Sequence, residues 1–175
     1  MRQVLVALVI SMVLPGWNAQ AADTAKEVPV FPSITLTSLD GTTQVNLEAF
    51  RGRPVLLTFW ASWCGPCRQE LPELEKLYGE LAGSGFVLLT INVDTSPRAG
   101  KRFLEQMKLN IPVYRLDPQT LAQLGVQSLP TNVLLNREGR PVQIYRGYSP
   151  ALPDDIRRLV RAMDEAETKG AEPSG

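Results

Sequence analysis

Apolar residues recur along the chain with two different periods, which predict alternating strands and helices. Residues 55–60 and 86–93 are almost wholly apolar, as expected for strands covered on both faces of a sheet. Between these runs the apolar residues have helical spacing, which predicts a helix that ends near Ala82 and is kinked at Pro72. The apolar positions of this helix are Leu71, Leu74, Leu77, Tyr78 and Leu81.

The second half of the chain continues the alternation with shorter elements. A helix is expected from Ser96, a short strand over residues 112–116 and a short helix from Asp117. Residues 132–135 and 142–145 are predicted strands joined by a turn, and a last helix follows them. A strand-helix-strand unit followed by a hairpin and a helix predicts an α/β fold, with a central mixed β-sheet flanked by helices.

The ends of the chain differ in composition from this core. Residues 22–30 are small and polar and are expected to form a linker. Residues 164–175 are charged and small and are expected to be a disordered tail. A single folded domain is therefore expected over residues 31–163.

A tight turn is predicted at Asp40-Gly41, near the start of this domain. Residues 33–39 alternate in part between apolar and polar side chains, and residues 43–47 follow the turn with a similar pattern. Two such segments around an Asp-Gly pair are typical of a β-hairpin.

Residues 1–21 have the three parts of a secretory signal peptide. Arg2 supplies the positive charge, residues 4–14 are an apolar stretch of eleven residues, and Ala-Gln-Ala at residues 19–21 is a small-x-small cleavage site. A membrane span needs about 20 residues, so cleavage is favoured over an uncleaved membrane anchor, which stays the alternative. We expect export to the periplasm, an oxidising compartment in which a pair of cysteines can be redox-active.

Length and charge restrict the class of protein. The 175 residues suit one domain, and 18 basic residues balance 18 acidic ones. No net charge therefore steers the protein to nucleic acid. The sequence contains no histidine, which excludes Ser-His and Cys-His catalysis. We expect a monomer that carries neither a metal nor a cofactor.

Cys64 and Cys67 are the two cysteines of the chain, and they lie where the predicted buried strand gives way to a helix. The unpaired N–H groups and the dipole of a helix start favour negative charge, so Cys64 is expected to be the exposed, activated thiol. Cys67 falls inside the first turn, where the chain can shield it. This arrangement predicts a disulfide that opens and closes, in which Cys64 attacks and Cys67 resolves.

Two other roles are conceivable for this pair of cysteines. One is half of a zinc site, but a tetrahedral Cys/His site cannot be built without further cysteines or histidines. The other is a purely structural disulfide, but closing so short a loop adds little stability, because the closure term grows with loop length. Both roles are therefore disfavoured.

The residues around the cysteines resemble a known family. Residues 59–72, Phe-Trp-Ala-Ser-Trp-Cys-Gly-Pro-Cys-Arg-Gln-Glu-Leu-Pro, are similar to the thioredoxin superfamily and to its extracytoplasmic thiol-disulfide oxidoreductases of the TlpA, ResA and CcmG type. The resemblance covers roughly residues 30–163 and implies a thioredoxin fold with an N-terminal β-hairpin extension. It also implies that Pro130 is a cis-proline facing the cysteines, and that Leu129 pairs its backbone with the substrate.

Aromatic and acidic residues near the cysteines complete the expected site. Trp63 should cover the site as an apolar rim that meets the substrate, and Trp60 should pack beneath it. Thioredoxins carry a buried Asp six residues before the first cysteine, where this chain has Thr58. Glu70 lies one helical turn after Cys67, in the place of a Glu that is proposed to assist thiol chemistry in ResA-like proteins. A half-buried Glu70 could move a proton, whereas a solvated helix glutamate is the ordinary alternative.

These observations favour an exported thiol-disulfide oxidoreductase that reduces disulfides in client proteins. The resemblance implies clients such as apocytochrome c, as in cytochrome c biogenesis, or a copper-handling or oxidase-assembly protein. It also implies a membrane electron donor of the DsbD or CcdA type. A periplasmic oxidant is an alternative, but oxidants of the DsbA type usually have a His between the cysteines, where this chain has Gly65-Pro66. A thioredoxin-fold binding or chaperone module is a further alternative, and a peroxidase is disfavoured because Ala61 replaces the expected Thr.

Overall fold

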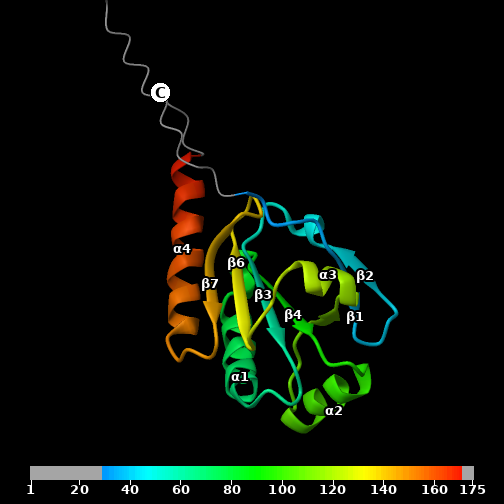
Figure 1. Cartoon of the computed structure of the whole chain (residues 1–175). Helices are drawn as coiled ribbons and strands as arrows, with labels where there is room; N and C mark the ends of the chain where they lie inside the picture. The colour runs from blue at the N-terminus through cyan, green and yellow to red at the C-terminus, as the bar shows by residue number, and fades with distance from the viewer. Residues whose placement is uncertain (1–28, 171–175) are drawn as a thin grey trace, which may run out of the picture.

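The computed structural model describes residues 29–170, and its centre is one seven-stranded β-sheet (Figure 1). The strands are β1 (Thr35–Ser38), β2 (Gln44–Asn46), β3 (Val55–Trp60), β4 (Val87–Asn92), β5 (Val113–Arg115), β6 (Thr131–Leu135) and β7 (Pro141–Arg146). They follow the order β2-β1-β5-β4-β3-β6-β7 across the sheet. β3 pairs in parallel with β4 and antiparallel with β6, so the predicted mixed sheet is confirmed.

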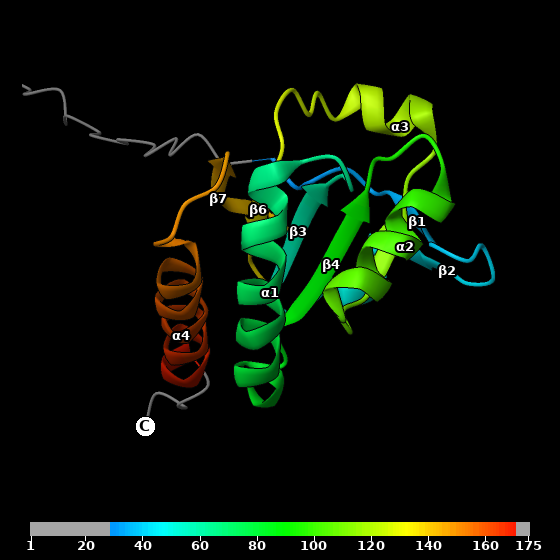
Figure 2. The same ribbon diagram turned by 90° about the horizontal axis from the view of Figure 1, so that it is seen from below.

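Helices cover both faces of the sheet (Figure 2). They are α1 (Gly65–Glu80), α2 (Pro97–Met107), α3 (Pro118–Gln123) and α4 (Leu152–Gly170), with short 3-10 turns η1 (Leu47–Phe50) and η2 (Ala82–Ser84). α1, α2 and α4 lie on one face and α3 lies on the other. α1 and α4 run side by side in both views and contact each other.

β3 lies in the middle of the core because both of its faces are covered. All six of its residues are buried. Leu56 packs with apolar residues of α1 and α4, and Trp60 packs with Cys67, on one face. Leu57 and Phe59 pack on the opposite face. The apolar run that predicts a doubly covered strand is therefore explained by its position between two layers.

Two polar side chains interrupt the core at the same level of the sheet. Thr58 of β3 and Asn132 of β6 are directly paired across the two strands, and both are completely buried. Residues paired in this way point to the same face, which here is the face covered by α1. Burying polar groups costs free energy unless they form hydrogen bonds, so a partner is expected for these two side chains on the face covered by α1.

The N-terminal hairpin predicted at Asp40-Gly41 is present. β1 and β2 pair antiparallel, and Gly41 has a positive φ of 77°, which glycine adopts without strain. Hydrogen bonds from the Ser38 hydroxyl, the Thr42 N–H and the Thr42 hydroxyl lower the pKa of Asp40 to about 2. β1 also pairs with β5, so the hairpin extends the central sheet.

α4 continues beyond the end that the sequence indicates for the domain. The sequence predicts a disordered tail from residue 164, whereas α4 is helical to Gly170. Arg137, in the turn between β6 and β7, forms ion pairs with Asp164 at 2.6 Å and with Glu167 at 3.0 Å. These charges therefore contact the rest of the fold, which the composition of the segment does not reveal.

The segment interpreted as a signal peptide, residues 1–21, lies outside the described residues. Residues 22–28 of the predicted linker do so as well. Within residues 29–170, no helix combines the length and the apolar character that crossing a membrane requires.

Candidate active site

Cys64 and Cys67 form a disulfide at the start of α1, as the sequence predicts. Cys64 caps the helix, and its Sγ accepts a hydrogen bond from the N–H of Cys67 at 3.2 Å. Pro66 lies in the first turn, where the N–H that it lacks has no partner within the helix. The sulfur of Cys64 therefore lies where the helix N–H groups and the dipole favour negative charge.

The two cysteines differ in their access to solvent. Cys64 is 5% exposed and Cys67 is completely buried, so their order of exposure is the predicted one, although Cys64 is less exposed than expected. Trp63 is 73% exposed beside them. Trp60 is buried beneath them and packs on Phe103, with the ring centroids 5.1 Å apart. A group arriving from solvent can therefore reach Cys64 before Cys67.

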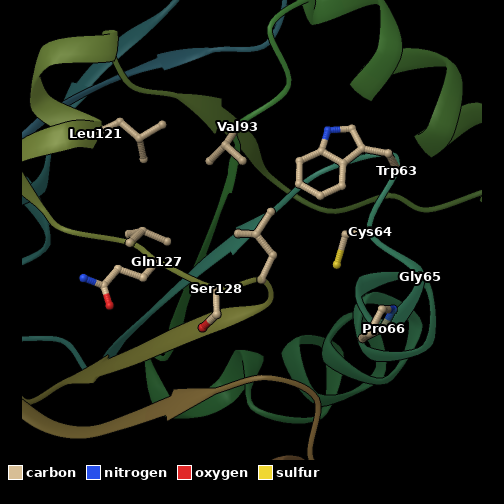
Figure 3. A pocket seen from close by; sticks show the side chains of 10 residues that line it. Trp63, Cys64, Gly65, Pro66, Val93, Leu121, Gln127 and Ser128 are labelled. Carbon is tan, nitrogen blue, oxygen red and sulfur yellow. The ribbon is translucent and has the colours of Figure 1, made fainter.

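An open cavity of about 530 Å³ lies next to Cys64 (Figure 3). Figure 3 shows Trp63 and Cys64 on one side of the cavity and Gln127 on the other. The far wall belongs to the loop before β6, which includes Leu129, and the Leu129–Pro130 bond is cis, as the resemblance implies. The lining residues are Trp63, Cys64, Gly65, Pro66, Val93, Leu121, Val126, Gln127, Ser128 and Leu129.

Glu70 is buried beneath the disulfide, with only 1% of its surface exposed. It follows Cys67 by one turn of α1 and points toward the sheet, where its Oε1 accepts a hydrogen bond from Nδ2 of Asn132 at 3.0 Å. Its other oxygen, Oε2, is buried and has no hydrogen-bond partner among the described residues. Glu70 is therefore more buried than the half-buried position that the sequence suggests.

Burial raises the pKa of Glu70 from 4.5 to about 7. The hydrogen bond from Asn132 opposes this rise, because it stabilises the ionised carboxylate. The nearby carboxylate of Glu73 adds a smaller increase to the pKa of Glu70 by repulsion. Glu70 can therefore exist in both protonation states near neutral pH, which is the property that a proton donor or acceptor requires.

Asp94 anchors the turn that carries the cysteines, and it belongs to none of the motifs recognised in the sequence. Both of its carboxylate oxygens accept from the N–H of Ser62, at 3.2 and 3.1 Å, and Oδ1 also accepts from the Ser62 hydroxyl at 3.0 Å. Nδ2 of Asn92 donates to Oδ2 at 2.9 Å. Its position just after β4 could have indicated this role. The parallel strands β3 and β4 end at the same edge of the sheet, and the turn that carries the cysteines follows β3.

Comparison with known proteins places this geometry in a family. A profile of the Redoxin family matches residues 25–160. The chain belongs to the Redoxin family. It is 30% identical over 171 residues to the thiol-disulfide oxidoreductase ResA of Bacillus subtilis, covering 95% of this chain and 93% of the relative. It is 32% identical to ResA of Bacillus thuringiensis over 118 residues, 66% of this chain and 67% of the relative.

The fold of this Redoxin-family chain is similar to solved structures of related proteins. A Chlorobium tepidum protein described as the thiol:disulfide interchange protein DsbE superposes with a TM-score of 0.68 at 32% identity. The match covers 77% of this chain and 94% of that protein. Together with the Cys64–Cys67 disulfide, these similarities identify a thioredoxin fold and a thiol-disulfide oxidoreductase of the TlpA, ResA and CcmG type.

Asp94→Ala should destabilise the oxidised protein by about 2–3 kcal/mol, because it leaves the buried donor of Asn92 and the part-buried donors of Ser62 without an acceptor. Urea unfolding at neutral pH measures the change. Thr95→Ala, at the exposed neighbouring position, serves as the control and should alter stability by less than about 0.5 kcal/mol. Equal unfolding midpoints for the two variants would contradict the anchoring role.

Glu70 should make the oxidised protein less stable as the pH rises from about 4.5 to about 7. In this range the native state keeps the proton on Glu70 while the unfolded chain releases it, so unfolding is favoured by increasing pH. The loss should total about 3 kcal/mol, and it should level off above the native pKa. Since the sequence has no histidine and the cysteines are paired, no imidazole or thiol titrates in this window.

Glu70→Gln removes the titrating group and should abolish this slope. Urea unfolding of both proteins at several pH values between 4 and 8 tests the expectation. Parallel stability curves for the two proteins would show that Glu70 titrates normally in the folded state.

Proposed function

We propose that this oxidoreductase is exported and reduces disulfides in client proteins through its Cys64-Cys67 dithiol. The observation that carries the proposal is the position of the disulfide. It opens onto an apolar cavity at a helix N-terminus, with one sulfur partly accessible and the other buried. A structural disulfide would need neither the cavity nor the difference in access.

Cys64 is the attacking thiol in this proposal. In the oxidised protein its sulfur caps α1 and accepts from the N–H of Cys67, and the same position would stabilise negative charge on the reduced sulfur. The Cys64 thiolate attacks one sulfur of the client disulfide, and the other client sulfur leaves as a thiolate. Cys67 then loses its proton and attacks Cys64, which restores the Cys64–Cys67 disulfide and releases the second client sulfur. Two electrons pass from the dithiol to the client.

Glu70 is the proton partner of Cys67 in this reaction. Cys67 is completely buried, so water is a poor base for its thiol. Thr58 stands where thioredoxins carry an acid, and a hydroxyl does not titrate at neutral pH. Glu70 lies one turn from Cys67, and its raised pKa of about 7 suits proton transfer at neutral pH.

Trp63 and Leu129 form the client-binding surface in this proposal, next to the buried Pro130. Trp63 exposes an apolar ring at the edge of the cavity, and Leu129 belongs to the opposite wall. An extended client segment around a disulfide could pair its backbone with Leu129 while its apolar side chains enter the cavity. The expected clients have exposed cysteine pairs in extended segments, as in apocytochrome c or a copper or oxidase-assembly protein.

The direction of the reaction follows from the residues between the cysteines. Gly65-Pro66 supplies no charge that would favour the reduced form, so the dithiol is suited to give electrons. Repeated turnover then needs a source of electrons outside the cytoplasm, for which a membrane donor of the DsbD or CcdA type is suited. We propose that the protein meets both donor and client as a monomer.

Export rests on residues 1–21, with their positive charge, apolar stretch and Ala-Gln-Ala site. The exported protein should therefore begin at Ala22 and be released from the membrane. Amino-terminal sequencing of the periplasmic fraction tests this expectation, and a protein that keeps Arg2 would instead retain the segment as an anchor.

Cys67→Ser should trap clients as stable mixed disulfides with Cys64, because the resolving thiol is missing. The reduced wild-type protein should reduce insulin disulfides, and Cys64→Ser should lower this activity to the background rate. Mass spectrometry of the trapped complexes identifies the clients. Trapping by Cys64→Ser instead would reverse the two roles, and a wild-type protein that does not reduce insulin would favour a binding module.

A further inference from the structure

Among the described residues, the side chain of Glu70 makes one hydrogen bond, and that bond is to an amide on β6. Nδ2 of Asn132 on β6 donates to Oε1 of Glu70 on α1 at 3.0 Å, and both side chains are almost completely buried. Oε2 of Glu70 has no partner among the described residues. The two oxygens of the carboxyl group are therefore in different environments.

The amide of Asn132 is not explained by packing. The rest of β6 beyond Asn132 is apolar, with Val133, Leu134 and Leu135 all buried. Asparagine is depleted in strands, and burying its amide costs free energy unless the amide is paired. Oδ1 of Asn132 has no partner among the described residues, so the bond to Glu70 is the one side-chain hydrogen bond found for this amide.

We propose that Asn132 is a positioning residue, which holds Oε1 of Glu70 and leaves Oε2 as the oxygen that takes the proton of Cys67. The inference rests on the proposed role of Glu70 as proton partner. Asn132 donates a hydrogen bond and does not itself exchange a proton, since a neutral amide does not titrate at neutral pH.

The step that this arrangement supports begins with the mixed disulfide between Cys64 and the client. The Cys67 S–H bond breaks, and its proton forms an O–H bond with Oε2 of Glu70. The Cys67 thiolate then attacks Sγ of Cys64. The bond between Cys64 and the client sulfur breaks, and the client leaves as a thiolate that takes a proton from solvent. Glu70 releases its proton later, and the charge and the electrons balance.

Asn132 also keeps Glu70 able to ionise. The titratable groups around Glu70 are Glu73 and Cys67 from α1, and Tyr148 from the loop between β7 and α4. The Tyr148 hydroxyl donates to Oε1 of Glu73 at 3.3 Å, and none of these three groups is a cation. Burial and Glu73 both raise the pKa of Glu70, and the hydrogen bond from Asn132 lowers it. Without Asn132 the carboxyl would hold its proton at neutral pH and could not accept another.

Asn132→Leu tests this role, because leucine has a similar size and no donor. Thr58→Val is the matched control, since Thr58 is the buried cross-strand neighbour of Asn132 and has no hydrogen bond to Glu70. Carbon-13 NMR of glutamate carboxyls in the oxidised proteins gives the pKa of Glu70, with Glu70→Gln used to assign the signal. We expect Asn132→Leu to raise this pKa by about one unit or more, and Thr58→Val to leave it nearly unchanged.

The reaction of the reduced proteins with the disulfide of Ellman's reagent provides the second measurement. Cys64 releases the first thionitrobenzoate and Cys67 the second, so the second phase reports resolution. A pKa that is one unit higher lowers the ionised fraction of Glu70 at pH 7 from about one half to about one tenth. The second phase of Asn132→Leu should therefore slow about fivefold at this pH, toward the rate of Glu70→Gln, and its pH profile should move upward.

An unchanged or lowered Glu70 pKa in folded Asn132→Leu would overturn the inference and leave the proposed role of Glu70 intact. A larger shift in Thr58→Val than in Asn132→Leu would assign the role to Thr58 and also overturn it. If Glu70→Gln releases the second thionitrobenzoate at the wild-type rate, Glu70 is not the proton partner and both proposals fail. Should Asn132→Leu not fold, Asn132→Ala also has no side-chain donor and is subject to the same outcomes.

Discussion

The first turn of α1 is the constraint on which the rest of the site depends. The chain leaves the buried strand β3 and enters the helix within a few residues, so the helix N–H groups meet a sulfur atom rather than water. One cysteine must then cap the helix and the other must lie inside it, where the core covers it. The chemical difference between two identical side chains thus follows from their positions on one helix.

Two buried carboxyl groups near this turn have opposite kinds of environment. Asp94 accepts hydrogen bonds on both oxygens from Ser62 and Asn92, so its carboxylate is fully occupied in holding the turn in place. Glu70 has one donor and one oxygen without a partner. The donors around Asp94 suit it to holding the backbone of the turn. The oxygen of Glu70 without a donor suits that residue to accepting a proton.

The sequence predicts what depends on local pattern. The apolar run of β3, the cysteines at its end and the hairpin at Asp40-Gly41 follow from strand composition, helix-start chemistry and turn preference. The cis bond at Pro130 was expected through resemblance, since an X-Pro bond alone gives no such indication.

The contacts that link distant segments were not predictable in the same way. The bond from Asn132 to Glu70 joins positions that are 62 residues apart, and Asp94 and Ser62 are 32 apart. A polar residue in an apolar strand indicates that a partner exists, but the partner is identified only when the strand register is known. The helical end of α4 was missed for a similar reason, because its charges pair with Arg137 in another element.

The two walls of the cavity are far apart in the sequence. This separation has a consequence for the order in which the parts of the site form during folding. Synthesis delivers the chain from its amino end, so Cys64 and Cys67 emerge well before β6 and the loop that precedes it. Until β6 pairs with β3, the nascent chain carries a dithiol without the opposing wall and without the amide that contacts Glu70. The cysteines therefore acquire the surroundings of the active site only when β6 has paired with β3 and the sheet is complete.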